Sequence, residues 1–206
     1  MNFDRVTAHD PGVVTGEQRE AAIVVPVVSR ADGAAILFTK RADHLPDHPG
    51  QMAFPGGGRE PEDEDLLATA LREADEEIGL NPSAVHIVGR LDDIRTVTDY
   101  SVRPFVGRIP DRDYLPGDEE VAEVVVLPVS ELTELDNYES EHRDHPHYGE
   151  IRLHFFYVDG YTVWGATARM LVQLLELATE WRMPPEPDRY AGPDDDLPER
   201  VRDEVQ

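Results

Sequence analysis

The chain has 206 residues, with 43 Asp and Glu against 19 Lys and Arg, and its formal net charge is −24. A chain of this length can bury one sizeable core, so two full domains are not expected. An acidic surface repels phosphate backbones and anionic lipids, which argues against nucleic acids and membranes as partners. The absence of cysteine excludes disulfides, thiolate metal sites and thiol nucleophiles.

The residues MNFDRVTAHDPG lack the basic and apolar regions of a secretion signal, and no apolar run reaches the roughly 20 residues of a membrane span. We therefore expect a cytoplasmic protein. Lys40 is the only lysine, so arginine supplies nearly all of the positive charge. Abundant acid with displaced lysine favours a halophilic origin over a merely acidic mesophilic one, because about 1 M salt shortens the Debye length to roughly 3 Å.

Two apolar runs, AAIVVPVV from Ala21 and AAILFT from Ala34, flank the turn-like SRADG and predict a β-hairpin. A helix is predicted from Pro61 to a terminating Gly79, because the acids at residues 62–65 suit the positive end of a helix dipole. Later strands are predicted at VHIVGRL, SVRPFVGRI, EVAEVVVLPV and IRLHFFYV, with helices near Ser130 and over residues 167–181. This order favours an α/β fold with a mixed sheet between helices.

By composition the chain divides into an N-terminal extension at residues 1–20, a folded domain at 21–183 and a tail at 184–206. The tail is rich in proline and acid and poor in aliphatic residues, so we expect it to be disordered. The segment ESEHRDHPHYGE contains three histidines, and we expect a polar loop there rather than a metal site.

Glu73, Glu76 and Glu77 lie three and four residues apart on the predicted helix, which brings Glu73 and Glu77 onto one stripe. Such like charges are unfavourable in water, and a divalent cation would neutralise them. Carboxylate oxygens favour Mg²⁺ or Mn²⁺ as that cation. A solvated acidic helix face is the alternative, and the spacing alone leaves both open.

Residues 58–80, GREPEDEDLLATALREADEEIGL, resemble the Nudix box, which is a Gly, five residues, a Glu, seven residues, Arg-Glu, an aliphatic residue, any residue, Glu-Glu, any residue, Gly and an aliphatic residue. The matching positions are Gly58, Glu64, Arg72, Glu73, Ala74, Glu76, Glu77, Gly79 and Leu80, with Ala74 smaller than usual. The resemblance implies a Nudix-type α/β/α sandwich and metal-dependent hydrolysis of a nucleoside diphosphate linked to another moiety.

The same resemblance implies roles for the residues of the box. Glu73 and Glu77 would be metal ligands, Glu73 would also take part in catalysis, and Glu76 would be a further ligand or the general base. Glu64 and the carbonyl of Gly58 are additional candidate ligands.

Two further residues complete the expected machinery. Arg72 would orient the glutamates through charge-assisted hydrogen bonds. Many Nudix enzymes use a glutamate outside the box as a base, and Glu120 is the candidate here, with a solvated strand edge as the alternative.

Upstream, LFTKRADHLPDHPGQMAFPGG resembles the additional signature of the coenzyme A diphosphatase branch, although Pro46 stands where that pattern has arginine. The matching positions are Leu37, Thr39, Arg41, Ala42, Gly50, Phe54, Pro55, Gly56 and Gly57. We take five of them as candidate substrate-binding residues, namely Arg41, Gly50, Phe54, Gly56 and Gly57.

Together the resemblances predict hydrolysis of coenzyme A or its thioesters to adenosine 3′,5′-bisphosphate and (acyl-)4′-phosphopantetheine, with Mg²⁺ or Mn²⁺. The expected partner is this small molecule. The alternatives are a Nudix diphosphatase for nucleotide sugars, dinucleotides or nucleoside triphosphates, and a non-catalytic nucleotide-binding module. The non-catalytic module is disfavoured because no glutamate of the box is lost.

Overall fold

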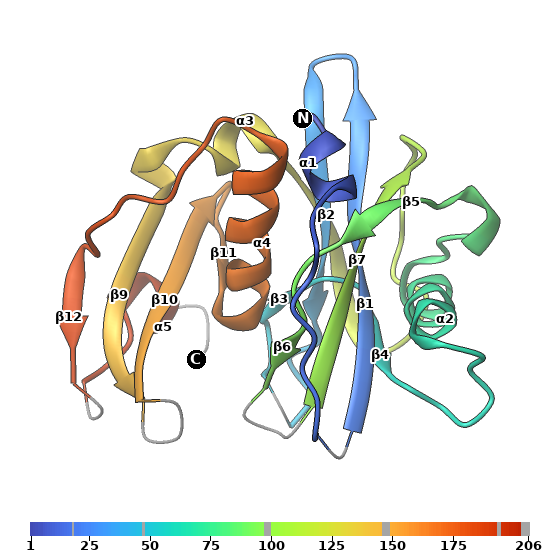
Figure 1. Cartoon of the computed structure of the whole chain (residues 1–206), viewed down its shortest axis with the longest axis horizontal. Helices are drawn as coiled ribbons and strands as arrows, with labels where there is room; N and C mark the ends of the chain where they lie inside the picture. The colour runs from blue at the N-terminus through green and yellow to red at the C-terminus, as the bar shows by residue number, and fades with distance from the viewer. Residues whose placement is uncertain (18, 47, 97–99, 146–148, 193–194, 203–206) are drawn as a thin grey trace.

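Figure 1 shows a computed structural model of the chain, which describes residues 1–17, 19–46, 48–96, 100–145, 149–192 and 195–202. Its larger sheet has eight strands, and their central order is β3 (Met52–Ala53), β2 (Gly33–Arg41), β1 (Arg19–Arg30), β7 (Tyr100–Ile109) and β5 (His86–Arg90). Beside these lie β4 (Gly56–Gly58) on β1, β6 (Ile94–Arg95) on β7 and β8 (Val121–Pro128) on β2. Strands β1 and β7 are parallel and the other pairs antiparallel, so the sheet is mixed, as predicted.

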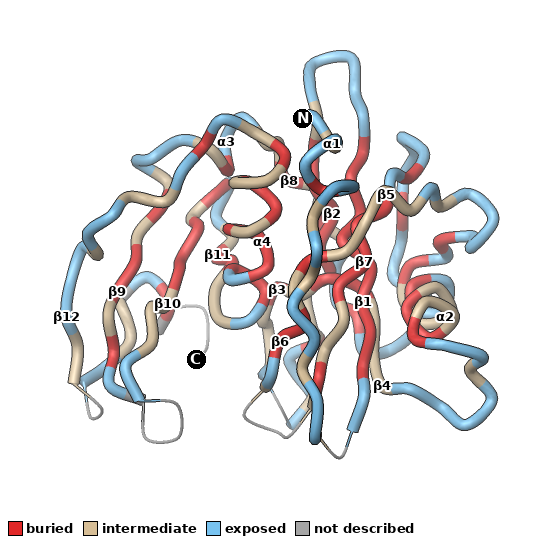
Figure 2. The backbone as a smooth tube through the Cα atoms, in the orientation of Figure 1, coloured by how far each residue is buried: buried red, intermediate tan, exposed pale blue. Residues whose placement is uncertain are grey.

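The predicted hairpin is formed by β1 and β2, which pair from Arg30 and Gly33 at the turn. Residues 21–28 of β1 are all buried, because both faces of the sheet are covered. Helix α2 (Leu66–Ile78) packs on one face and α4 (Gly165–Ala178) lies on the other. Figure 2 shows the buried segments of the central strands between these helices.

A second, four-stranded sheet lies beyond α4, with the order β11 (Tyr161–Trp164), β10 (Gly149–Val158), β9 (Tyr138–His145) and β12 (Arg189–Ala191). The remaining short elements are α1 (Asp4–Thr7), η1 (Pro82–Ala84), α3 (Val129–Leu132), η2 (Leu135–Asn137) and α5 (Glu199–Arg202). In the described part of the chain, no helix combines the length and apolarity that a membrane span requires.

Helix α2 begins later than the sequence pattern predicted. Asp65 is its N-cap, and its carboxylate accepts a hydrogen bond of 2.8 Å from the backbone N–H of Ala68. The acids that precede Asp65 therefore lie outside the helix rather than in its first turn. The helix ends as predicted, at Gly79 with φ 63°.

The segment that was expected to be a polar loop instead contains strand β9. Its Glu141 side chain is fully buried, and Oε1 accepts a hydrogen bond of 2.7 Å from Nε of Arg143. Arg189 of strand β12 donates to the other carboxylate oxygen at 2.5 Å. These charge pairs compensate the buried carboxylate and allow the acidic strand to pack. The sequence did not predict this strand because it has no alternating hydrophobic pattern.

Residues near both ends of the chain contact the rest of the structure. Val6 of α1 is buried in the same core as α4, and Val201 of α5 is fully buried. Strand β12 pairs in parallel with β9, and Arg152 donates hydrogen bonds to the carbonyls of Pro185 and Glu186. The described part of the tail is therefore held to the second sheet at these contacts, although most of its side chains are exposed.

Candidate active site

Strand β4, which consists of three glycines, lies directly against helix α2. A Cβ atom at Gly56 would lie 2.3 Å from the carbonyl oxygen of Ala22, and φ at Gly56 is 147°. A Cβ at Gly57 would lie 2.6 Å from the carboxylate of Glu73. Only glycine therefore lets this strand approach both β1 and the helix carboxylates.

Glu77 faces the same strand, and its Oε2 accepts a hydrogen bond of 3.2 Å from the backbone N–H of Gly56. Burial raises the pKa of Glu77 to about 8, and the nearby carboxylates of Glu73, Asp118 and Glu120 act in the same direction. Burial also raises the pKa of Glu73, although the charge of Arg72 opposes this effect. The site thus concentrates negative charge that a cation would relieve.

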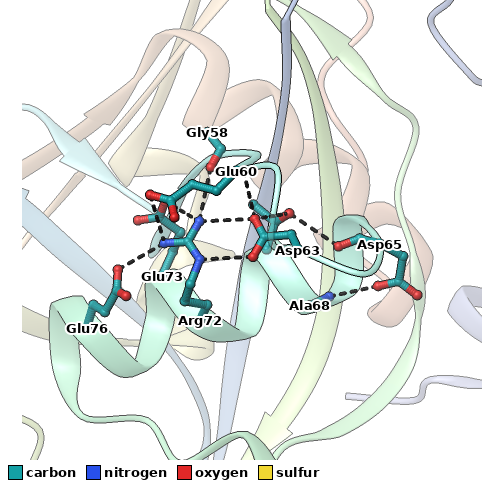
Figure 3. A network of polar contacts seen from close by, with 9 residues as sticks. Gly58, Glu60, Asp63, Asp65, Ala68, Arg72, Glu73 and Glu76 are labelled. Atoms are coloured by element: carbon teal, nitrogen blue, oxygen red, sulfur yellow. Dashed lines mark hydrogen bonds and ion pairs between the residues drawn. The ribbon is translucent and has the colours of Figure 1, made fainter.

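Arg72 is the centre of the polar network around these carboxylates (Figure 3). Its guanidinium donates to Glu73 at 3.1 Å, to Glu76 at 3.0 Å and to the carbonyl of Gly58 at 3.2 Å. No ion pair links it to Glu77 in the described residues. Arg72 thus contacts Glu73 and Glu76, and among the described residues no arginine forms an ion pair with the half-buried Glu77.

The sequence patterns missed Asp63, which binds Arg72 through two hydrogen bonds of 3.0 and 3.2 Å. The Asp63 side chain is only 5% exposed, and it also accepts a hydrogen bond from the Thr69 hydroxyl. Hydrogen bonds from Arg72 hold the pKa of Asp63 well below its usual range. The sequence shows only that Asp63 is one of four consecutive acids, which the helix dipole already explains.

The loop that leads into β8 crosses the end of helix α2. The N–H of Gly117 donates to the carbonyl of Glu77 at 2.7 Å, and a Cβ at Gly117 would lie 2.1 Å from the carbonyl oxygen of Glu76. The Asp118 carboxylate accepts a hydrogen bond from the N–H of Glu120. This close crossing brings the candidate base Glu120 near Glu77.

The other candidates from the sequence fall into two groups. Arg41 lies 3.8 Å from Glu120, and Gly50, with φ 68°, donates its N–H to the carbonyl of Arg41, so both belong to the surroundings of the site. Glu64 is exposed, and in the described chain it is not among the ion-pair partners of Arg72, the residue that holds Glu73 and Glu76. Phe54 is 3% exposed and stacks on Phe38, so its side chain is part of the core rather than a ligand surface.

A metal ion would meet two carboxylates here rather than a complete protein cage. Within the described residues, no three Asp, Glu or His side chains converge as a metal site. Glu73 and Glu77 nevertheless supply hard oxygen donors next to the glycine strand, Glu73 beside Gly57 and Glu77 beside Gly56. This set fits Mg²⁺, which commonly binds one or two carboxylates and takes its other ligands from water and substrate phosphates.

Residues 18–148 match a family model described as NUDIX domain. The chain is 42% identical over 161 residues to a protein of Enterobacter sp. (strain 638) named uncharacterized Nudix hydrolase NudL, covering 76% of this chain and 81% of the relative. A protein of the same name from Yersinia pestis (strain Pestoides F) is 36% identical over 176 residues, covering 84% and 86%.

Among solved structures, the NUDIX domain of Shewanella oneidensis NrtR complexed with ADP ribose matches at 16% identity with a TM-score of 0.46, covering 63% of this chain and 84% of that one. A C. elegans Ap4A hydrolase matches at 19% identity with a TM-score of 0.45, covering 53% and 80%. At these values neither likeness assigns a substrate to this chain.

Proposed function

Because the chain belongs to the Nudix family of hydrolases, which act on nucleoside diphosphate derivatives and generally use divalent metal ions, we propose that its substrate is coenzyme A or a thioester of it. Hydrolysis of the central diphosphate would release adenosine 3′,5′-bisphosphate and 4′-phosphopantetheine or its acyl form. Water adds to one phosphorus, the bridging P–O bond breaks, and a carboxylate of the enzyme accepts the proton of the water.

The observation that carries this proposal is the contact between the upstream segment and the helix glutamates. Gly56 and Gly57 end that segment, and they touch Glu77 and Glu73 respectively. Arg41, from the start of the segment, lies 3.8 Å from Glu120. Residues of the segment that resembles the coenzyme A branch therefore lie next to the glutamates of the segment that resembles the Nudix box. This supports the proposal that both segments bind the same substrate.

We assign the metal to Glu73 and Glu77, where it would offset the charge of the substrate phosphates and acidify a water molecule. Arg72 fixes the Glu73 carboxylate through a charge-assisted hydrogen bond of 3.1 Å. Glu77 keeps its orientation through the N–H of Gly56. Both carboxylates are thereby held in place before a substrate arrives.

Glu120 is the proposed proton acceptor. Glu76 is the other candidate, but its carboxylate accepts a hydrogen bond of 3.0 Å from the Arg72 guanidinium, which occupies an oxygen that would otherwise face the water molecule. Glu120 is close enough to raise the pKa of Glu77, and its own charge partner, Arg41, is 3.8 Å away. Glu120→Gln should therefore lower kcat more than Glu76→Gln.

The test is a panel of diphosphate substrates with Mg²⁺ or Mn²⁺, comprising coenzyme A, acetyl-coenzyme A, nucleotide sugars, dinucleotides and nucleoside triphosphates. We expect the highest kcat/KM for coenzyme A or its thioester. A higher kcat/KM for any other class would reject the coenzyme A proposal and leave the family assignment intact. Nucleotide binding without any turnover would favour a non-catalytic module.

A further inference from the structure

A surface hollow of about 420 Å³ adjoins the glycine strand, and none of the sequence motifs accounts for its side chains. It is lined by residues of β1, β4, β7 and the segment after β4, which are Arg19, Glu20, Gly58, Arg59, Glu60, Pro61 and Tyr100. A Cβ at Gly58 would lie 3.9 Å from the Tyr100 ring, whereas a Cβ at Gly57 would meet Glu73. Successive strand residues face opposite ways, so the hollow and Glu73 lie on opposite faces of β4.

Two arginines and a tyrosine gather in this hollow. The guanidinium of Arg19 lies 5.1 Å from the ring centroid of Tyr100, and its Nη1 is 3.4 Å from the Tyr100 hydroxyl. Arg59 is held by a hydrogen bond of 2.8 Å to Glu20. These groups offer planar guanidinium N–H donors and a hydroxyl, which is the donor chemistry that phosphate groups prefer.

The charge balance of the hollow differs from that of the whole chain. Its lining contains two arginines and two glutamates, whereas the chain has 43 acidic residues against 19 basic ones. A polyanion at the strongly negative carboxylate site would therefore meet less repulsion here than over most of the acidic surface. Because exposed charges are screened by water and salt, we expect each arginine to contribute modestly.

The hollow borders the Arg72 network, because Gly58 and Glu60 line the hollow and also contact Arg72. The Gly58 carbonyl accepts a hydrogen bond of 3.2 Å from Arg72, and Glu60 lies 3.9 Å from the same guanidinium. Figure 3 shows both residues next to Glu73 in this network. The hollow is lined by Gly58, the last residue of β4, and by residues 59–61 after it, so a ligand whose diphosphate lies at Glu73 and Glu77 could extend past the end of β4 to reach it.

We infer that this hollow binds a phosphomonoester on the nucleoside half of the substrate, separate from the diphosphate that is cleaved. The inference rests on the proposed function, because coenzyme A carries such a group on its ribose at the 3′ position. Arg19 and Arg59 contact this phosphate and Tyr100 donates its hydroxyl hydrogen to it. A phosphomonoester carries a charge of about −1.5 to −2, so its binding depends strongly on the positive charge of these two arginines.

The kinetic test compares coenzyme A with 3′-dephospho-coenzyme A for the wild type, Arg19→Gln and Arg59→Gln. We expect each substitution to lower kcat/KM for coenzyme A about three- to tenfold, mainly through KM, and to leave kcat/KM for the dephospho compound unchanged. Arg30→Gln is the control, because Arg30 is an exposed arginine that pairs with Asp111 away from the hollow. Equal effects on both substrates, or no effect on either, would overturn the inference.

A binding measurement separates this inference from the proposed function. Calorimetry with adenosine 3′,5′-bisphosphate and with adenosine 5′-monophosphate requires no turnover. If the wild type binds the bisphosphate more tightly and both arginine variants lose that preference, the hollow is a phosphate site even if coenzyme A is not hydrolysed. Equal affinity of the wild type for the two nucleotides would refute it even if coenzyme A is the substrate.

Discussion

Asp63 binds the Arg72 guanidinium through two hydrogen bonds, with Nε 3.0 Å from Oδ1 and Nη2 3.2 Å from Oδ2. Arg72 in turn contacts Glu73, so Asp63 fixes the arginine that orients a candidate metal ligand. The carboxylate of Asp63 is almost fully buried, which makes this pair an internal support of the site rather than a surface ion pair.

Asp63→Asn should lower both stability and kcat. The amide keeps its size but loses the charge, which weakens two hydrogen bonds to a cation and costs about 2 kcal/mol. For a chain of this length the loss corresponds to a fall in Tm of roughly 4–8 °C. Asp65→Asn is the matched control, because asparagine is also a good N-cap. Thermal unfolding and kcat of the two variants provide the test, and equal behaviour would contradict the role of Asp63.

Stability should fall between pH 6.5 and pH 4 because of His154. Burial lowers the pKa of this side chain from 6.5 to about 4, and the charges of Arg152 and Arg169 add to the effect. In that window the unfolded chain binds a proton that the folded chain does not, so the free energy of unfolding decreases as the pH is lowered. Above pH 6.5 neither the folded nor the unfolded chain binds this proton, so the loss of stability due to His154 is absent.

The expected size of this effect is up to about 3 kcal/mol, and it should disappear in His154→Gln. Urea unfolding at several pH values would measure the free energy of unfolding of the wild type and of this variant. Taking the difference between the two removes the effect of the carboxylates that both proteins share. His86→Gln is the control, because His86 is exposed. If the difference in free energy of unfolding between the wild type and His154→Gln did not change with pH, His154 would not be a buried neutral imidazole.

Truncation after Met183 should lower Tm by several degrees and leave kcat nearly unchanged. The truncation removes Arg189, which pairs with the fully buried Glu141, and it removes Val201 from the core. Loss of a partner from a buried carboxylate is strongly unfavourable. Arg189→Gln should reproduce part of this loss. An unchanged Tm would mean that the tail does not support the second sheet in solution.

Salt should raise both stability and kcat/KM if the protein comes from a halophile, as we propose from its composition. A chain with a net charge of −24 repels itself and a polyanionic substrate at low ionic strength. At roughly 1 M KCl the screening length is about 3 Å, so this repulsion is largely removed. Tm and kcat/KM are to be measured from dilute buffer to molar KCl at fixed free Mg²⁺. Maximal values of both in dilute buffer would contradict the proposed halophilic origin.

Local signals predicted the elements whose causes are themselves local. The β1–β2 hairpin follows from two apolar runs around a turn, and the end of α2 follows from Gly79 in a left-handed conformation. The start of α2 was wrong because four consecutive acids gave no reason to single out Asp65 as the cap. Asp63 could not be assigned because its partner Arg72 is nine residues away and the pair forms only through a loop.

The second sheet could not be predicted for a different reason. Strand β9 has no apolar alternation, and its packing depends on Glu141 meeting Arg189, which lies 48 residues later in the chain. The same pairing orders β12 in a segment whose composition suggests disorder. For Phe54 a family resemblance suggested substrate contact, whereas the side chain stacks on Phe38 in the core. Such outcomes depend on contacts between distant residues.

The most direct test of the central claim is to identify the products formed from coenzyme A by the wild type and by Glu77→Gln in the presence of Mg²⁺. We predict adenosine 3′,5′-bisphosphate and 4′-phosphopantetheine in equal amounts from the wild type, and a rate lower by about 100-fold or more in the variant, because even outer-shell partners of metal ligands are worth 10- to 100-fold. Glu62→Gln, an exposed acid outside the helix, should retain the wild-type rate. Intact coenzyme A after incubation with the wild type, or wild-type turnover by Glu77→Gln, would contradict the account.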